Sequence, residues 1–219
     1  MERTEPELVT RVYLATDPEA LSQAVEALRA GQLVAFPTDT VYGVGCDLWQ
    51  ERALERIYWA KLRPRNLAIP LLVSGPEQVA QVARDLPPLF GPLVERFWPG
   101  GLTVIVPRQP SLPEILCAGG DTVAVRMPNH PYALRLIAEM GGALAVTSAN
   151  LSGRPSPRTA QEVLADLRGR VAVVVDGGAC PGGVASTIVD LVSQPPRLLR
   201  QGEVDVEALR RLLPTLVLP

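Results

Sequence analysis

Apolar residues follow two different spacings along the chain. In some segments they recur every three or four positions, which is the period of an amphipathic helix. In shorter segments they form nearly continuous runs bounded by Gly or Pro, as in a buried strand. The first spacing predicts helices over residues 22–30, 51–61, 76–84, 87–97, 130–142 and 206–213, and one more that begins at Thr159.

The short apolar runs predict eight strands, and the polar segment TDTVYGVGCD (38–47) is expected to be a loop. Strands and helices are interleaved, but several strands follow one another near the C-terminus. We therefore expect an α/β fold, a three-layer domain with a twisted, mixed (parallel and antiparallel) open sheet. The predicted strands cover residues 33–37, 69–73, 102–108, 122–128, 143–150, 171–178, 186–192 and 198–204.

Local signals mark some helix ends. TDPE (16–19) fits a capping box, and Gly31 is a natural stop for the helix that follows it. Lys61 is the last residue of the helix over 51–61 and is expected to face the next loop. The length suggests one domain over 1–219, with its core over about 17–202 and a C-terminal strand and helix over 198–213.

Composition narrows the class of protein. Hydrophobic residues make up 47% and charged residues 20%, which is typical of a globular chain. The net charge of −2 gives no global reason to expect nucleic-acid binding. No apolar run is long enough to span a membrane, and the start MERTEPELVTR is too charged for a signal peptide. We expect a cytoplasmic protein without a membrane partner.

Cysteine and histidine limit the possible chemistry. The three cysteines, Cys46, Cys117 and Cys180, have no CxxC spacing and are expected to be reduced thiols. With a single histidine, His130, a zinc site or a Ser-His-Asp hydrolase is improbable. His130 lies between a strand-like and a helix-like run, where a capping role is common.

The basic residues include a single lysine. Of the 21 basic residues, 20 are Arg and one is Lys61, two positions before Arg63. A cation at a helix C-terminus complements the helix dipole, but Arg would serve equally well there. A compact ammonium beside a forked guanidinium suits a polyphosphate. The G-x-G-x-x-G and G-x-x-x-x-G-K-[ST] signatures of nucleotide binding are both absent.

Polar residues collect at the ends of several predicted strands, where open α/β sheets bind ligands. They lie in PTDTVYGVG (37–45), in TSAN (147–150), in GGVASTIVD (182–190) and at Arg126. Each segment alone also fits an ordinary turn or strand entry.

Together these segments resemble the YrdC/Sua5 family of threonylcarbamoyl-AMP synthases. The matching pieces follow in family order: PTDTVYGVG, KLRP, GGLTVIV, DTVAVRMPNHP, TSANLSGRPSP, and GGVASTIVD with LLRQG. The hallmark K-x-R and S-x-N is met by Lys61, Arg63, Ser148 and Asn150.

The resemblance implies an enzyme that converts L-threonine, bicarbonate and ATP to threonylcarbamoyl-AMP and pyrophosphate for N6-threonylcarbamoyl modification of tRNA adenosine 37. It implies a positively lined cleft, Mg²⁺ carried with ATP rather than by protein side chains, and no organic cofactor. tRNA or double-stranded RNA and the transferase machinery are the further partners to consider.

The resemblance also implies roles for twelve residues. Lys61, Arg63, Ser148 and Asn150 match catalytic positions. The residues that match threonine-binding positions are Thr40, Arg126, Val146 through its backbone, and Ser186. Those that match ATP-binding positions are Lys61, Arg63, Asn66, Thr122, Ser148, Asn150, Ser156 and Arg200.

Departures from the family pattern keep other hypotheses open. Leu67 stands where many relatives have a polar residue, and Asn66 is the candidate substitute. The segment IPLLV lacks a His found in some members, and the chain resembles the short form of the family. The alternatives are a YrdC-like RNA-binding module, a YciO-like paralogue without this activity, and a carbamoyl-transfer domain of the hydrogenase-maturation type. The intact SAN segment and the absence of zinc-finger cysteines argue against the last two.

Overall fold

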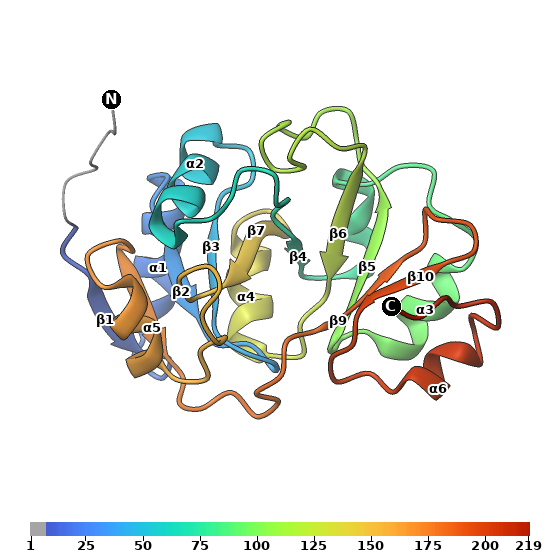
Figure 1. Cartoon of the computed structure of the whole chain (residues 1–219). Helices are drawn as coiled ribbons and strands as arrows, with labels where there is room; N and C mark the ends of the chain where they lie inside the picture. The colour runs from blue at the N-terminus through green and yellow to red at the C-terminus, as the bar shows by residue number, and fades with distance from the viewer. Residues whose placement is uncertain (1–7) are drawn as a thin grey trace.

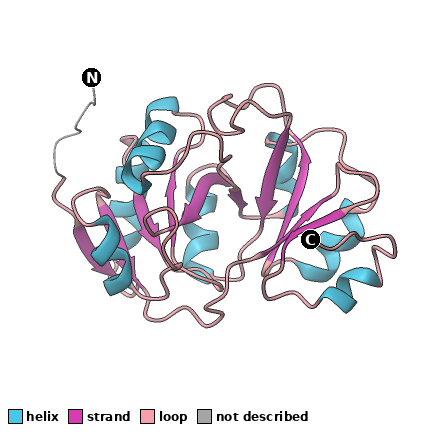
Figure 2. Ribbon diagram, viewed as in Figure 1, coloured by secondary structure: helices cyan, strands magenta, loops and turns pink. Residues whose placement is uncertain are grey.

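The computed structural model describes residues 8–219, and residues 1–7, part of the charged start, lie outside the described residues. Across residues 8–219 the strands form a single ten-stranded sheet. Figures 1 and 2 show how its strands and the helices are arranged. In chain order the elements are β1 (Arg11–Leu14), α1 (Ala20–Arg29), β2 (Val34–Phe36), β3 (Gly43–Cys46), α2 (Glu51–Lys61), β4 (Leu71–Val73), the 3₁₀ helix η1 (Pro76–Gln81), α3 (Phe90–Phe97), β5 (Leu102–Pro107), β6 (Thr122–Arg126), α4 (Pro131–Glu139), β7 (Ala143–Ser148), α5 (Ala160–Leu167), β8 (Val173–Asp176), β9 (Thr187–Asp190), β10 (Arg197–Arg200) and α6 (Val206–Arg210).

The sheet is mixed, as predicted. Its strand order is β1-β8-β2-β3-β7-β4-β6-β5-β9-β10. Parallel pairs are β1–β8, β2–β8, β4–β6 and β5–β9, and the other neighbours are antiparallel. The predicted boundaries of a single domain stay a prediction, although strands from both ends of the chain share this sheet.

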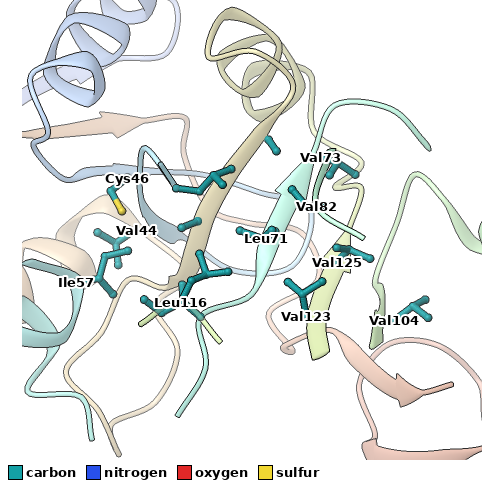
Figure 3. Close-up of a cluster of buried hydrophobic side chains, with 14 of the residues drawn as sticks. Val44, Cys46, Ile57, Leu71, Val73, Val82, Val104, Leu116, Val123 and Val125 are labelled. Carbon is teal, nitrogen blue, oxygen red and sulfur yellow. The ribbon is translucent and has the colours of Figure 1, made fainter. Parts of the chain in front are cut away.

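Two groups of buried side chains cover the two faces of the sheet. On one face, α1 and α4 pack Leu28 and Leu136 against Val34 and Leu144. On the other face lies the larger group, part of which Figure 3 shows, including Val44, Ile57, Leu71 and Val125. Because strand side chains alternate, Leu71 and Leu72 of β4 belong to opposite groups. Helices on both faces confirm the expected three layers.

Two strands were missed by the sequence prediction. β1 is a short edge strand whose side chains are mostly exposed, so it has no buried alternation to detect. β3 lies inside the segment predicted to be a polar loop, where its glycines indicated a turn. A Cβ at Gly43 would lie 2.7 Å from the Val146 side chain, so close packing between β3 and β7 requires glycine there.

Helix ends also differ from the prediction in places. The Thr16–Glu19 capping box does not form: α1 begins at Ala20, and its N-cap Glu19 makes no side-chain cap bond. Asp17 instead accepts a hydrogen bond from the Glu19 amide at 2.9 Å, which makes a local turn. Gly31 has φ +71° directly after the helix, which confirms the predicted stop. The expected helix over 76–84 is the shorter 3₁₀ helix η1.

Candidate active site

A cavity of about 500 Å³ lies on the face of the sheet that α1 and α4 cover elsewhere. Strands β4 to β7 and β9 form its wall through residues such as Leu72, Ile105, Ala124 and Ile188. Among the described residues that line it are three arginines and no carboxylate. Eight of the twelve predicted site residues line this cavity: Thr40, Arg63, Arg126, Val146, Ser148, Ser156, Ser186 and Arg200.

The other four predicted residues lie outside the lining. Asn66 is exposed in the α2–β4 loop, while Leu67 beside it does line the cavity. Thr122 begins β6 and lies on the same face of that strand as Ala124. Lys61 and Asn150 are buried. A larger cavity of about 660 Å³ between α1 and α4 contains none of the predicted residues and mixes acidic with basic side chains.

Arg126 is held on three sides at the end of β6. It is 6% exposed, and its Nε donates to the Gly100 carbonyl at 2.9 Å. Nη1 donates to Thr40 Oγ1 at 2.8 Å, and Nη2 donates to Asp39 Oδ1 at 2.5 Å. Burial lowers the pKa of Arg126, and the charge of Asp39 opposes that shift. Each terminal nitrogen keeps one more N–H, which is what a bidentate contact with a carboxylate needs.

The Thr40 hydroxyl is oriented by its neighbour in the same loop. Thr38 donates its only hydroxyl proton to the Val41 carbonyl at 2.7 Å. In the 3.0 Å contact between the two threonine hydroxyls, Thr40 is therefore the donor. Because Thr40 also accepts from Arg126, it keeps one lone pair. Thr40 can thus accept a hydrogen bond from a ligand N–H or O–H.

A second polar group of the cavity comes from the C-terminal strands. Arg200 of β10 donates to the Ser186 carbonyl from Nε at 2.9 Å and to Ser186 Oγ from Nη2 at 3.1 Å. Ser186 Oγ is also 2.7 Å from the Thr103 hydroxyl of β5. The pKa of Arg200 is lowered by burial and by the positive charge of Arg126. The predicted residues Ser186, Arg200 and Arg126 thus form one electropositive region.

Lys61 and Arg63 point in different directions because the chain reverses between them. α2 ends at Lys61, and its C-cap Leu62 adopts the left-handed conformation with φ 51°. Arg63 then turns to the cavity, where its Nε and Nη2 donate to the carbonyls of Leu67 at 3.2 Å and Ala68 at 2.6 Å. The expectation that Lys61 faces the following loop is wrong.

Lys61 instead points into the protein. It is 1% exposed, and Nζ donates to the carbonyls of Ser148 at 2.5 Å and Asn150 at 2.6 Å. The pKa of Lys61 is lowered to about 7, mainly by burial and also by the positive charge of Arg63, while the charge of Asp166 opposes the shift. The K-x-R and S-x-N segments are therefore in direct contact, although they lie far apart in the sequence.

Sequence reasoning missed Asp39 and Thr103. Asp39 lies in the quoted PTDT segment, and its position beside a threonine of the predicted site was the available signal. Thr103 is one of several polar residues on apolar strands, and only its pairing with Ser186 distinguishes it. His130 caps α4, because its Nδ1 accepts from the Ala133 amide at 3.4 Å, which confirms the capping role. Cys46, Cys117 and Cys180 are buried and free, and burial raises the pKa of each thiol.

The fold and cavity define an α/β protein with an arginine-lined cavity on an open mixed sheet. The Sua5/YciO/YrdC family model, described as "Telomere recombination", matches residues 26–202. The chain belongs to this family.

Curated relatives extend the comparison. The threonylcarbamoyl-AMP synthase of Pyrococcus abyssi is 42% identical over 85% of this chain and 55% of the relative, and that of Bacillus subtilis is 42% identical over 91% and 58%. The chain thus spans a little over half the length of these two relatives. A putative threonylcarbamoyl-AMP synthase of Mycobacterium tuberculosis strain H37Rv is 39% identical over 94% of this chain and 96% of the relative.

Solved structures agree with the fold. P. abyssi Sua5 complexed with L-threonine has a TM-score of 0.91 and 38% identity over 96% of this chain and 62% of that one. Escherichia coli YciO has a TM-score of 0.80 at 24% identity, over 93% of this chain and 98% of that one, and shows the shared fold alone. Within residues 8–219, no helix combines the length and apolar character needed to cross a bilayer.

Proposed function

We propose that this chain is an enzyme, a nucleotidyltransferase that forms threonylcarbamoyl-AMP from L-threonine, bicarbonate and ATP and releases pyrophosphate. The observation that carries the proposal is the cavity in which Arg63, Arg126 and Arg200 converge and no carboxylate lines the described wall. Such a lining favours two anionic groups, a triphosphate and an amino-acid carboxylate. Relatives that match the chain over most of its length are named for this reaction.

The two anions have different counterparts in the cavity. Arg126 is buried and fixed by Asp39 and Thr40, so it offers a bidentate site of defined orientation for the threonine carboxylate. Thr40 would accept a hydrogen bond from the threonine amine or hydroxyl. Arg63 keeps its Nη1 free of bonds to the other described residues and would contact the phosphates, together with the Ser148 hydroxyl.

The chemistry needs positioning more than a reactive side chain. The threonine amine attacks bicarbonate, a C–N bond forms, and water leaves to give a carbamate. A carbamate oxygen then attacks the α-phosphorus of ATP, and the bond from that phosphorus to the pyrophosphate oxygen breaks. Fixed positive charge around the departing phosphates stabilises this step in a site that excludes water.

Mg²⁺ would accompany the nucleotide in this proposal. It prefers hard oxygen ligands in octahedral geometry, and the phosphate oxygens supply them. Within the described residues there is no group of three or more His, Cys, Asp or Glu that could hold a metal ion. The lining hydroxyls of Ser148 and Ser156 are compatible with a hydrated, phosphate-bound cation. When bound, the ion would neutralise charge on the leaving pyrophosphate.

The product would serve tRNA modification in the cytoplasm. The carbamoyl-adenylate is a mixed anhydride and therefore an activated donor. A second enzyme would transfer its threonylcarbamoyl group to an adenosine amine, with AMP as the leaving group. We propose that tRNA and this transferase machinery are the downstream partners, as the family resemblance implies.

The test is to incubate the protein with ATP, Mg²⁺, bicarbonate and each amino acid in turn. Pyrophosphate release and the mass of the adenylate are measured. We expect a threonine-dependent product with the mass of threonylcarbamoyl-AMP and no product when bicarbonate is omitted. A lack of any threonine-dependent adenylate would refute the proposed function, and salt-resistant RNA binding without turnover would favour an RNA-binding module.

A further inference from the structure

The three N–H donors of the Lys61 ammonium all have partners inside the protein. Two donate to the carbonyls of Ser148 and Asn150, as described above. The third donates to Asn150 Oδ1 at 3.4 Å. An ammonium has three donors and no acceptor, so none remains for a ligand in this arrangement. Lys61 also does not line the cavity.

Both N–H donors of the Asn150 side-chain amide are also used within the protein. Its Oδ1 accepts from Lys61, and its Nδ2 donates to the carbonyls of Leu151 at 3.0 Å and Arg154 at 2.6 Å. It is 5% exposed. Asn150 therefore continues the hydrogen-bond chain from Lys61 into the turn over residues 150–154. Its own side chain has no donor left for a nucleotide.

The same turn is held at two more points. The backbone carbonyl of Lys61 accepts from the Ser152 amide at 2.8 Å. From the other side, Asp166 of α5 accepts from the Leu151 amide at 3.0 Å and from Arg154. The turn is thus fixed between the end of α2 and the face of α5. Ser148, at the start of this connection, is the residue that faces the cavity.

We propose that Lys61 is a positioning residue that fixes the segment 148–154 beside the cavity and leaves contact with the substrate phosphates to Arg63 and Ser148. The inference rests on the proposed function for its kinetic consequences but not for its structural ones. The K-x-R and S-x-N segments each contribute one residue to the cavity wall and one buried residue behind it. Lys61 and Asn150 are the buried pair.

This role explains why the one lysine of the chain stands here. Three oxygen atoms converge on one nitrogen, which matches a compact ammonium on a flexible stem. A guanidinium spreads its donors over a plane and is larger, so it cannot reproduce the three contacts in a site that is 1% exposed. If Lys61 only supplied charge to a phosphate, we would expect arginine to serve at this position as well.

The structural test is hydrogen–deuterium exchange of the ligand-free protein. We expect Lys61→Met and Lys61→Arg to raise exchange of the amides in residues 150–154 by about tenfold or more, because local opening no longer breaks the Lys61 contacts. Arg65→Met is the matched control, since Arg65 is an exposed cation in the loop that follows Lys61, and it should leave this exchange unchanged. Unchanged exchange in both Lys61 variants would overturn the inference.

The kinetic test is a double-mutant cycle with Lys61→Met and Asn150→Ala in the pyrophosphate-release assay. If both act through the turn, the double variant loses no more activity than the more impaired single variant. We expect the turnover number to fall while the KM for threonine, which binds elsewhere in the cavity, changes less than about threefold. Losses that multiply would show that Lys61 acts on the phosphates independently and would overturn the inference.

The exchange test and the kinetic test distinguish a failure of the proposed function from a failure of the proposed role of Lys61. A wild-type protein that forms no adenylate would refute the proposed function, and the exchange arm would still decide the role of Lys61. If Lys61→Met fails to fold, Asn150→Ala tests the same hydrogen-bond chain from its other end, with the same increase in exchange expected and an unchanged value overturning it.

Discussion

At the scale of single residues, the site combines rigid anchors with groups that keep free bonding capacity. Arg126 is the clearest case, because three protein oxygens hold its guanidinium and two N–H groups remain. A buried ion pair is costly to break, since it leaves one charge without its partner. Asp39 therefore orients Arg126 in the ligand-free protein and keeps a positive group fixed where a carboxylate is expected.

Arg126→Lys should weaken the binding of threonine and leave the binding of ATP unchanged. A lysine supplies one point charge and cannot keep the contacts to Gly100, Thr40 and Asp39 together with a bidentate carboxylate contact. We expect the KM for threonine to rise by roughly 30- to 100-fold, equivalent to about 2–3 kcal/mol for lost charge-assisted hydrogen bonds. Initial rates of pyrophosphate release at varied threonine and at varied ATP measure this.

The matched control is Arg135→Lys, an exposed arginine on α4 outside this cavity. It should leave both KM values unchanged. Equal increases in the KM for ATP and for threonine in Arg126→Lys would contradict a dedicated carboxylate anchor.

At the scale of elements, the end of α2 is the most informative local structure. A leucine in the left-handed conformation is unusual, and Leu62 occupies it with its side chain 64% exposed. This conformation reverses the chain after α2, so Lys61 and Arg63 point in different directions. The bond from the Arg63 amide to the Tyr58 carbonyl at 2.9 Å closes the helix end.

Leu62→Gly should stabilise the protein. Glycine adopts a positive φ without the Cβ strain that costs other residues about 1–2 kcal/mol, and part of this gain is lost to the greater entropy of unfolded glycine. We expect a net increase of about 0.5–1 kcal/mol in the free energy of unfolding, read from urea titrations. Leu86→Gly, an exposed leucine without positive φ, is the control and should give no gain. A loss of stability in Leu62→Gly would contradict the inference that the backbone of Leu62 is strained.

At the scale of the whole molecule, sheet topology builds the cavity from distant segments. β9 and β10 join the sheet beside β5, which brings Ser186 and Arg200 to the same face as Arg126. The opposite face of β6 stays in the main core, where Val123 and Val125 are buried. One strand thus separates a packed core from a polar cavity.

Ala124→Leu should lower the activity of the protein without changing its stability. The new side chain would fill part of the cavity on the face of β6 that carries Arg126, without entering the core. We expect pyrophosphate release to fall by at least about tenfold with an unfolding free energy within about 0.5 kcal/mol of wild type. Val123→Leu on the opposite face is the control and should cost about 1–3 kcal/mol of stability through overpacking. Full activity of Ala124→Leu would mean that the substrates bind elsewhere.

The sequence by itself determined most elements and much of the site. Apolar period and length predicted eight of the strands and most of the helices, because burial on one face imposes a regular spacing. Polar residues at strand ends indicated the loops of the cavity. Resemblance to family motifs then singled out Arg63, Arg126, Ser148 and Arg200, all of which line it.

Only the tertiary structure decided what each polar residue does. Asp39 was found through its contact with Arg126, and Thr103 through its contact with Ser186, and neither contact is local in sequence. β3 stayed hidden because its glycines serve packing against β7 rather than a turn. Lys61 was singled out as the one lysine, but the predicted direction of its side chain was wrong, since that direction depends on the left-handed turn at Leu62 and on carbonyl oxygens 87 and 89 positions away. The local pattern of apolar and polar residues predicts which positions are buried and which secondary structure they favour. The hydrogen-bond partners of a polar side chain depend instead on which strands the fold places side by side.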